Sequence, residues 1–327
     1  MKGNFNKILC VLTDTHKQDE VVAQALHIAK NHQAELTILL KLEALPPNAH
    51  MVMQSFAYLE KQSSIESAAQ AWLDGQLKAW VGDYPVTTDV HIGQSYVELV
   101  QHIMVHHYDL VLKLSDSGFI ERLFGSDDFT LLRKCPVPVW IVHPGNSQQY
   151  DTVVAALDLN YHYPEHEISV RRKLNMDILR YAAQIALMEF SQLHIVHVYD
   201  AVPESILRGD FISVDENSLE ADLQTIYAER EKELARLLGE LDKELHEGAL
   251  ESLNPQQHIV RGYPRREIAA TAKSVDAKAV VIGTVARLGV PGFIMGGTAE
   301  ETIHQLDCAL LGIKPDGFVS PVSMPDN

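Results

Sequence analysis

The feature that most constrains the fold of this chain is an internal repeat of alternating strand-like and helix-like segments. Short apolar runs alternate with longer segments whose apolar residues recur at helical spacing. The plan runs once through the first half and starts again after a polar joint near residue 150. The predicted strands are 8–13, 36–42, 86–92, 109–112 and 137–142 in the first half, and 153–157, 193–199, 258–260, 279–282 and 310–313 in the second.

Long helical crossovers between strands require parallel neighbours, because a short turn can join only antiparallel strands. The pattern therefore predicts an α/β protein made of two tandem, doubly wound, five-stranded parallel-sheet domains of Rossmann-like type. A length of 327 residues suits two domains of about 150 residues each. We expect the first domain at residues 1–145, the second at 150–315, and a C-terminal tail at 316–327.

Charge and apolar run lengths exclude several classes of partner. The formal net charge of −17 argues against nucleic acid or an anionic membrane surface, because phosphate contacts need clustered Lys and Arg. No window approaches the roughly 18 apolar residues of a membrane helix, and the apolar run at Ile8–Leu12 is too short for a signal peptide. The three cysteines, Cys10, Cys135 and Cys308, form no Cys-x-x-Cys pair and suit a reducing compartment. These features predict a cytoplasmic protein.

A glycine-rich loop follows the strand predicted at 279–282. Gly283 ends that strand, and Thr298 is a good N-cap for the helix that comes next. Main-chain amides in such a strand-to-helix loop can bind phosphate oxygens. The spacing fits neither the Rossmann fingerprint nor the P-loop. Glycine-rich turns also occur in α/β domains that bind nothing, so the loop alone leaves both possibilities open. The other loop glycines are Gly289, Gly292, Gly296 and Gly297.

The spacing from Gly283 through Ala286 to Gly296 and Gly297 resembles the G-x2-G-x9-G-(S/T) loop of the universal stress proteins, which holds ATP in many members. Ala286 stands where that family has its second glycine, and Gly297 where it has Ser or Thr. A strand ending at Asp158, a strand closing with His-Val, and a Gly-x-Pro turn within residues 260–268 are also similar to the family. The resemblance covers both halves, as in the tandem two-domain members.

This resemblance implies an ATP site in the second domain. Asp158 would lie on the adenine or ribose side, and Val198 would pack on the base; a strand-end residue that caps the next turn is the alternative role for Asp158. The glycine loop would hold ribose and phosphates. The predicted nucleotide-binding residues are Ala156, Asp158, Val198, Gly283, Thr284, Gly296, Gly297 and Thr298.

The first copy departs further from the family pattern. Lys113 replaces the first loop glycine in our sequence alignment of the two halves, although Gly125 and Ser126 match the final Gly-Ser. Asp127 and Asp128 follow, and each would repel a bound phosphate by about 3 kcal/mol at ~5 Å with an effective dielectric near 20. We therefore expect the second copy to keep a nucleotide site, and the first to have lost it or taken another ligand.

By resemblance, the predicted function is a non-catalytic, ATP-binding regulatory module that supports survival under oxidative, starvation or DNA-damaging stress. Slow ATP hydrolysis or phosphotransfer is one alternative, although the sequence offers no dedicated base. A scaffold, or a carrier of a small metabolite in the first domain, is another. The closing strands would pair the two halves, with a homodimer as a further possibility. We predict no metal site, because no carboxylate or cysteine completes the cluster of His102, His106 and His107.

Overall fold

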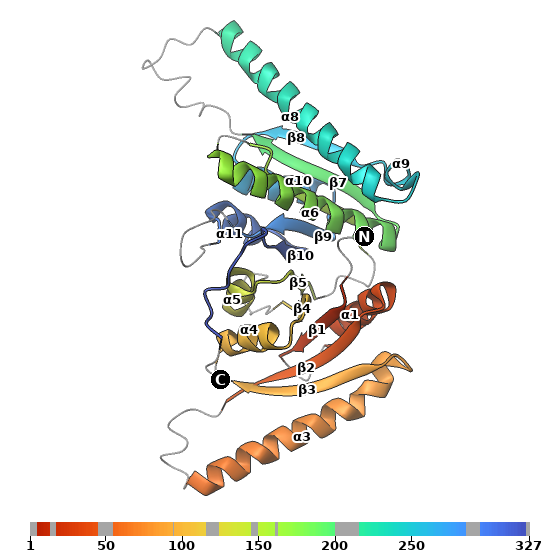
Figure 1. Cartoon of the computed structure of the whole chain (residues 1–327), viewed down its shortest axis with the longest axis vertical. Coiled ribbons are helices and arrows are strands. Elements are labelled where there is room, and N and C mark those ends of the chain that lie inside the picture. The colour runs from red at the N-terminus through yellow and green to blue at the C-terminus, as the bar shows by residue number, and fades with distance from the viewer. Residues whose placement is uncertain are drawn as a thin grey trace. The chain divides into compact units, whose positions relative to one another are not determined.

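The computed structural model describes residues 5–13, 18–44, 55–93, 95–115, 124–144, 150–160, 163–199, 216–285 and 295–324 (Figure 1). These residues form two compact units. One unit contains the described residues up to 144 together with 319–324, and we call it the first domain. The other contains residues 150–318, and we call it the second domain.

The first domain is built on a parallel sheet with the strand order β3-β2-β1-β4-β5. Its strands are β1 (Lys7–Leu12), β2 (Glu35–Glu43), β3 (Val86–Gly93), β4 (Leu110–Leu114) and β5 (Val139–Val142). Its helices are α1 (Asp19–His32), α3 (Ser55–Val81), α4 (Tyr96–Val105) and α5 (Ser126–Lys134). Helices α1 and α3 pack together, and so do α4 and α5, which gives the sheet two helical layers.

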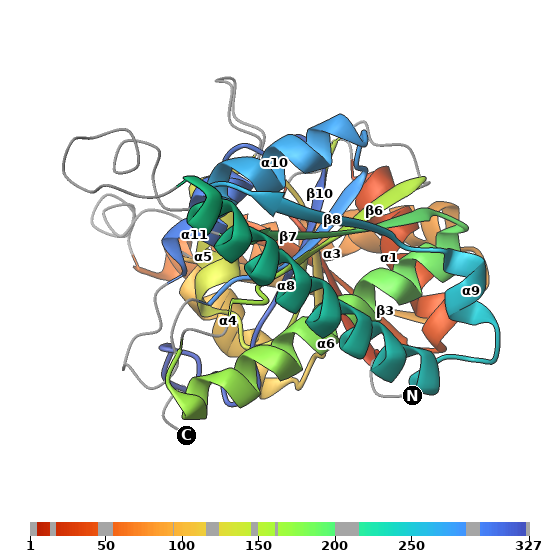
Figure 2. The same ribbon diagram turned by 90° about the horizontal axis from the view of Figure 1, so that it is seen from above.

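The second domain repeats the plan with the strand order β8-β7-β6-β9-β10, again all parallel. Its strands are β6 (Thr152–Leu157), β7 (Gln192–Tyr199), β8 (Gln256–Arg261), β9 (Ala279–Gly283) and β10 (Ala309–Ile313). Its helices are α6 (Glu165–Glu189), α8 (Glu216–Glu244), α9 (Ala249–Leu253), α10 (Pro264–Ser274) and α11 (Gly297–Ile303). Figure 2 shows α10 on one face of this sheet and α6 and α8 on the other.

The predicted fold class, two tandem doubly wound parallel-sheet domains, is confirmed. The apolar runs form central strands because both of their faces are covered by helices, so nearly every side chain in β1, β4, β6 and β9 is buried. In both sheets the strand order reverses between the first and fourth strands of the repeat, where ligands of such folds bind.

The two copies differ most in the helix after the first strand. Helix α6 has 25 residues, whereas α1 has 14. Both helices end at a left-handed C-cap residue, Gln33 and Phe190, and the next strand begins with an equivalent main-chain hydrogen bond. The additional residues therefore lie at the N-terminal end of α6. In sequence, residues 161–166 are an insertion that the first copy lacks, and from Glu165 the chain forms extra helical turns beside the carboxyl ends of the strands.

Candidate functional site

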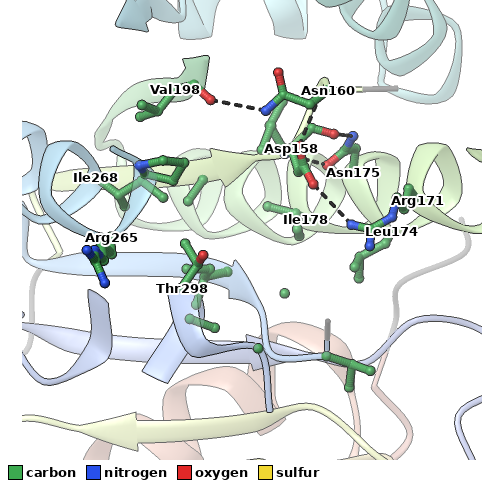
Figure 3. Close-up of a pocket in the computed structure, with 18 of the residues that line it drawn as sticks. Asp158, Asn160, Arg171, Leu174, Asn175, Ile178, Val198, Arg265, Ile268 and Thr298 are labelled. Carbon is green, nitrogen blue, oxygen red and sulfur yellow. Dashed lines mark hydrogen bonds and ion pairs between the residues drawn. The ribbon is translucent and has the colours of Figure 1, made fainter. Parts of the chain in front are cut away.

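A cavity of about 520 Å³ lies in the second domain at the carboxyl ends of β6, β7 and β9 (Figure 3). This volume falls in the range of roughly 300–1,000 Å³ that is common for small-molecule sites. The gap between β6 and β9 is the point where the strand order reverses. The cavity is lined by Ala156, Leu157, Asp158, Asn160, Tyr163, Arg171, Leu174, Asn175, Ile178, Val198, Tyr263, Pro264, Arg265, Ile268, Ile282, Gly283, Val285, Gly296, Gly297, Thr298, Ala299 and Glu301.

Seven of the eight predicted site residues lie in this lining. Thr284 does not, because its side chain is fully buried and its hydroxyl contacts the Ile313 carbonyl and the Lys314 ammonium. An antiparallel bridge between Val285 and Met295 joins the two ends of the glycine loop. The intervening loop residues named above, Ala286, Gly289 and Gly292, lie outside the described residues.

Glycine at position 283 is explained by packing. A Cβ atom there would lie 2.8 Å from Cδ2 of Leu174 and 3.6 Å from Cδ1 of Ile178, both on α6. The N-terminal extension of α6 can approach β9 closely because this side chain is absent. Gly297 is different, because a Cβ atom at this position would meet no atom of the described residues within 4 Å. Its glycine therefore leaves open space beside the cavity.

Asp158 is held by a network of hydrogen bonds at the end of β6. Its Oδ2 accepts from Arg171 Nη1 at 3.0 Å and from the Tyr163 hydroxyl at 2.9 Å. Its Oδ1 accepts from the Asn160 main-chain N–H at 3.1 Å, and the Asn175 side chain bonds both main-chain groups of Asp158. The carboxylate is still 38% exposed, so a ligand donor can reach it. Asp158 is thus both a local cap and a wall of the cavity.

Tyr163 and Arg171 form a stacked pair beside Asp158. The Arg171 guanidinium carbon lies 3.4 Å from the Tyr163 ring centroid, which is a close cation–π contact. Arg171 Nη2 also lies 3.4 Å from Glu167 Oε2. Burial and the neighbouring Asp158 charge raise the pKa of Tyr163 to about 12, so its hydroxyl remains a donor at neutral pH. Both residues belong to the insertion and the α6 extension, so an alignment of the two halves offers no counterpart that could have identified them.

The remaining wall on this side is mainly apolar. Leu174, Ile178, Val198, Ile268 and Ile282 come from α6, β7, α10 and β9. The Val198 carbonyl accepts a hydrogen bond from the Asn160 side chain at 3.3 Å. Such a surface suits a flat, apolar group with a polar edge, which is the character of a nucleobase.

Beneath this wall lies His197, whose side chain is almost completely buried. Its Nδ1 is 3.3 Å from the Leu159 main-chain N–H and 3.2 Å from the Leu157 carbonyl. Burial is the main cause that lowers the pKa of His197 to about 4, so the ring is neutral at pH 7. It supports the main chain on either side of Asp158.

The other side of the cavity is formed by the first turns of α10 and α11, which pack together. The Gly-x-Pro turn places Tyr263 at the N-cap and Pro264 at the first position of α10. The N-cap of α11 is Gly296 rather than the predicted Thr298, so the amides of Gly297 and Thr298 lie in a first turn, where helical N–H groups have no partner within the helix. Arg265 pairs with Glu301 here, at 3.0 Å.

The charges that line the cavity balance. Arg171 and Arg265 carry positive charges, and Asp158 and Glu301 carry negative charges. The described residues of the lining are therefore formally neutral together, although the whole chain carries −17. Both carboxylates accept hydrogen bonds from arginine, an arrangement that suits binding better than general-base chemistry.

The first domain fills the equivalent region with a buried ion pair. Lys113 Nζ lies 2.8 Å from Asp128 Oδ1 and 3.0 Å from the Leu114 carbonyl, and both charged side chains are fully buried. Asp128 Oδ2 also accepts a hydrogen bond from the Gly125 main-chain N–H at 2.9 Å. The carboxylate of Asp128 thus binds the N-terminal turn of α5 itself.

Strand register corrects our sequence alignment of the two loops. Ser115 N bonds Val142 O after β4, and Thr284 N bonds Ile313 O after β9, so these two residues are equivalent. Leu114 then stands at the position of Gly283, and Lys113 at that of Ile282. The expectation that Lys113 replaces the loop glycine is wrong by one residue. The partner of Asp158 is likewise Thr13, because β1 ends at Leu12 and β6 at Leu157.

The described residues show neither a metal cluster nor a membrane-spanning helix. No group of three or more His, Cys, Asp or Glu side chains among them is arranged to hold a metal ion, although the His102 and His106 rings lie 4.3 Å apart. In the same part of the chain, no helix has the length and apolar character needed to cross a membrane.

The sequence matches one known protein family twice, once in each domain. The model of the universal stress protein family matches residues 4–143 and again 174–314. The second match begins within α6, so it does not include Asp158, Tyr163 or Arg171. Universal stress protein E of Photorhabdus laumondii is 26% identical over 331 residues, and that of Escherichia coli K12 is 28% identical over 329. In both cases the alignment covers 98% of each chain.

The fold also has a counterpart among solved structures. A functionally unknown protein from Pseudomonas aeruginosa PAO1 matches with a TM-score of 0.68 at 23% identity. The match covers 95% of this chain and 93% of the other.

Proposed function

The chain belongs to the universal stress protein family, and from this membership we propose that its second domain binds ATP as a non-catalytic regulatory module of the stress response. The observation that carries the proposal is the cavity at the β6/β9 switch point, which brings together seven residues chosen from sequence alone. The cavity also has the division of character that a nucleotide requires, with an apolar wall on one side and an open glycine turn on the other.

Each part of the nucleotide has candidate partners in this lining. Val198, Ile178 and Ile282 would pack on the base. The exposed part of the Asp158 carboxylate would accept from a base or ribose donor, while Arg171 and Tyr163 hold it in place. Gly296, Gly297 and Thr298 would hold the phosphates through the main chain and the Thr298 hydroxyl. Bound ATP would then favour one arrangement of the glycine loop and of the surface around it, and a partner protein would recognise that arrangement.

Titration calorimetry with ATP tests the proposal. We expect one site per chain, because Lys113 and Asp128 fill the corresponding region of the first domain. The sharpest variant transfers that ion pair to the second domain as Ile282→Lys with Ala299→Asp, since residue 299 has the helical position of Asp128. This double variant should abolish binding, while circular dichroism should show an unchanged fold.

A second variant keeps the test decisive if the transferred pair disturbs folding. Gly297→Phe fills the open space beside the cavity and should also abolish binding. The matched control is Ser126→Phe at the same helical position in the first domain, which should leave ATP binding intact. Absence of heat with wild-type protein would refute the proposal. Release of ADP at a rate that falls in Asp158→Ala would favour an enzyme instead.

A further inference from the structure

Among the described residues of the cavity lining are two arginines, and they are held very differently. The Arg171 side chain is 16% exposed, contacts Asp158 and Glu167, and stacks on Tyr163. The Arg265 side chain is 56% exposed, and its charge pairs with Glu301, which is 51% exposed. An exposed ion pair of this kind contributes about 0–1 kcal/mol, so exchanging its partner costs little. Arg171 is therefore fixed, whereas Arg265 can change partners.

Arg265 also has hydrogen-bonding capacity in reserve. Both of its contacts with Glu301 use Nη1, at 3.0 and 3.1 Å. A guanidinium has five N–H donors in a planar fork, and phosphate is the group that such a fork binds best. Within the described residues, the donors of Nε and Nη2 remain available for a ligand.

The position of Arg265 indicates which end of the cavity would hold the phosphates of a nucleotide. Figure 3 shows Arg265 and Thr298 on one side of the cavity, and Asp158 and Arg171 on the other. Arg265 lies in the first turn of α10, which packs against α11 and its glycine turn. A polyphosphate chain that extends from a base near Val198 past Gly297 would therefore end beside Arg265.

We propose that Arg265 is a specificity-determining residue that binds the terminal phosphates, so that the site selects nucleoside di- and triphosphates over monophosphates and nucleosides. The inference rests on the proposed function, because it assumes a nucleotide in this cavity. Glu301 holds Arg265 when the cavity is empty and competes with the ligand for it. When Arg265 leaves Glu301, its guanidinium becomes available to phosphate oxygens, while the net charge of the lining is unchanged.

Affinity measured against phosphate number tests the inference. In titration calorimetry with ATP, ADP, AMP and adenosine, Arg265→Gln should weaken ATP binding by about ten- to hundred-fold, the usual loss for a charge-assisted hydrogen bond. Adenosine binding should be unchanged. Glu301→Gln should act in the opposite direction and tighten ATP binding several-fold, because it removes the competitor.

Matched controls are adjacent in the sequence. Arg266→Gln removes the same charge from a side chain that is 79% exposed and absent from the cavity lining, so ATP affinity should change less than about two-fold. Glu300→Gln is the equivalent control for Glu301. If wild-type protein binds ATP but Arg265→Gln and Arg266→Gln behave alike, the inference is overturned and the proposed function stands. If wild-type protein binds none of the four ligands, both are overturned.

Discussion

The carboxyl ends of β4 and β9 show how one fold can close or open the same site. In the second domain, Ile282, Gly283 and Ala299 leave space for a cavity. In the first domain, Lys113, Leu114 and Asp128 occupy the equivalent positions, and the buried ion pair binds the first turn of α5 from within. A carboxylate at a helix N-terminus satisfies the same amides that would otherwise attract a phosphate. Two charged residues in the first domain thus form an internal contact where the second domain has part of the cavity wall.

The largest effect is expected when this ion pair is broken. Asp128→Ala leaves the Lys113 ammonium buried without its partner, which should reduce the free energy of unfolding by about 3–5 kcal/mol. Lys113→Ile with Asp128→Ala gives the first domain the residues of the second, and should be close to wild type in stability. Trp72, Trp80 and Trp140 all lie in the first domain, so urea unfolding followed by tryptophan fluorescence measures it directly. Equal losses in the single and double variants would contradict this account.

A smaller effect is expected at His197, which should make the stability of the second domain depend on pH. The equivalent position in the first domain is Leu40, because His197 pairs with Leu157 as Leu40 pairs with Leu12. The pKa of His197 is about 4 in the folded protein, below the ordinary 6.5, so the unfolded chain binds the proton more readily. The contribution to stability is complete above pH 6.5 and is lost as the pH falls toward 4, by roughly 3 kcal/mol in total.

His197→Leu should remove this pH dependence from the second domain. Urea unfolding at pH 7, 5.5 and 4.5 would be followed by circular dichroism, with the first domain identified separately by its tryptophans. The pKa of His102 in the first domain is also lowered to about 4, mainly by burial, so the first domain keeps its own dependence of the same sign and serves as the internal control. If the free energy of unfolding of the second domain still falls with pH in His197→Leu as in wild type, another group is responsible.

A substitution at Gly283 tests whether α6 approaches β9 as closely as the structure shows. Gly283→Ala places a methyl group 2.8 Å from Leu174 Cδ2, and overpacking of this kind costs about 1–3 kcal/mol. Leu174→Ala in the same chain should recover part of that loss by removing the clashing group. Thermal unfolding of the single and double variants gives the coupling between the two sites. Additive losses would mean that Leu174 is not the group that excludes a side chain at position 283.

The smallest effect sharpens the comparison at the first helical position, where the first domain has Ser126 and the second has Gly297. Gly297→Ser places a hydroxyl in open space beside the cavity, so the fold should be unaffected. If phosphate lies there, the added hydrogen bond should tighten ATP binding by up to about ten-fold, corresponding to 0.5–1.5 kcal/mol. The measurement is titration calorimetry of Gly297→Ser and Gly297→Ala with ATP. Because alanine adds the Cβ atom without the hydroxyl, the comparison separates the effect of the hydroxyl from that of the added Cβ atom.

The sequence by itself determined the fold class and identified seven of the residues that line the cavity of the second domain. Parallel strands and long crossovers follow from hydrophobic periodicity, which depends only on local spacing. The glycine loop, Asp158 and Val198 were chosen from the resemblance to the family, and all lie at or near the ends of predicted strands, whose carboxyl ends a parallel sheet brings together.

Only the tertiary structure decided the rest. Strand register moved the counterpart of Gly283 from Lys113 to Leu114, since a shift of one residue is invisible in a pattern of uniformly apolar strands. The tertiary structure also shows that Thr284 does not line the cavity. The segment after the insertion is helical, and its extra turns place Arg171 and Leu174 in the lining. These outcomes depend on contacts between residues far apart in the chain, and such contacts are set by how helices pack on the sheet.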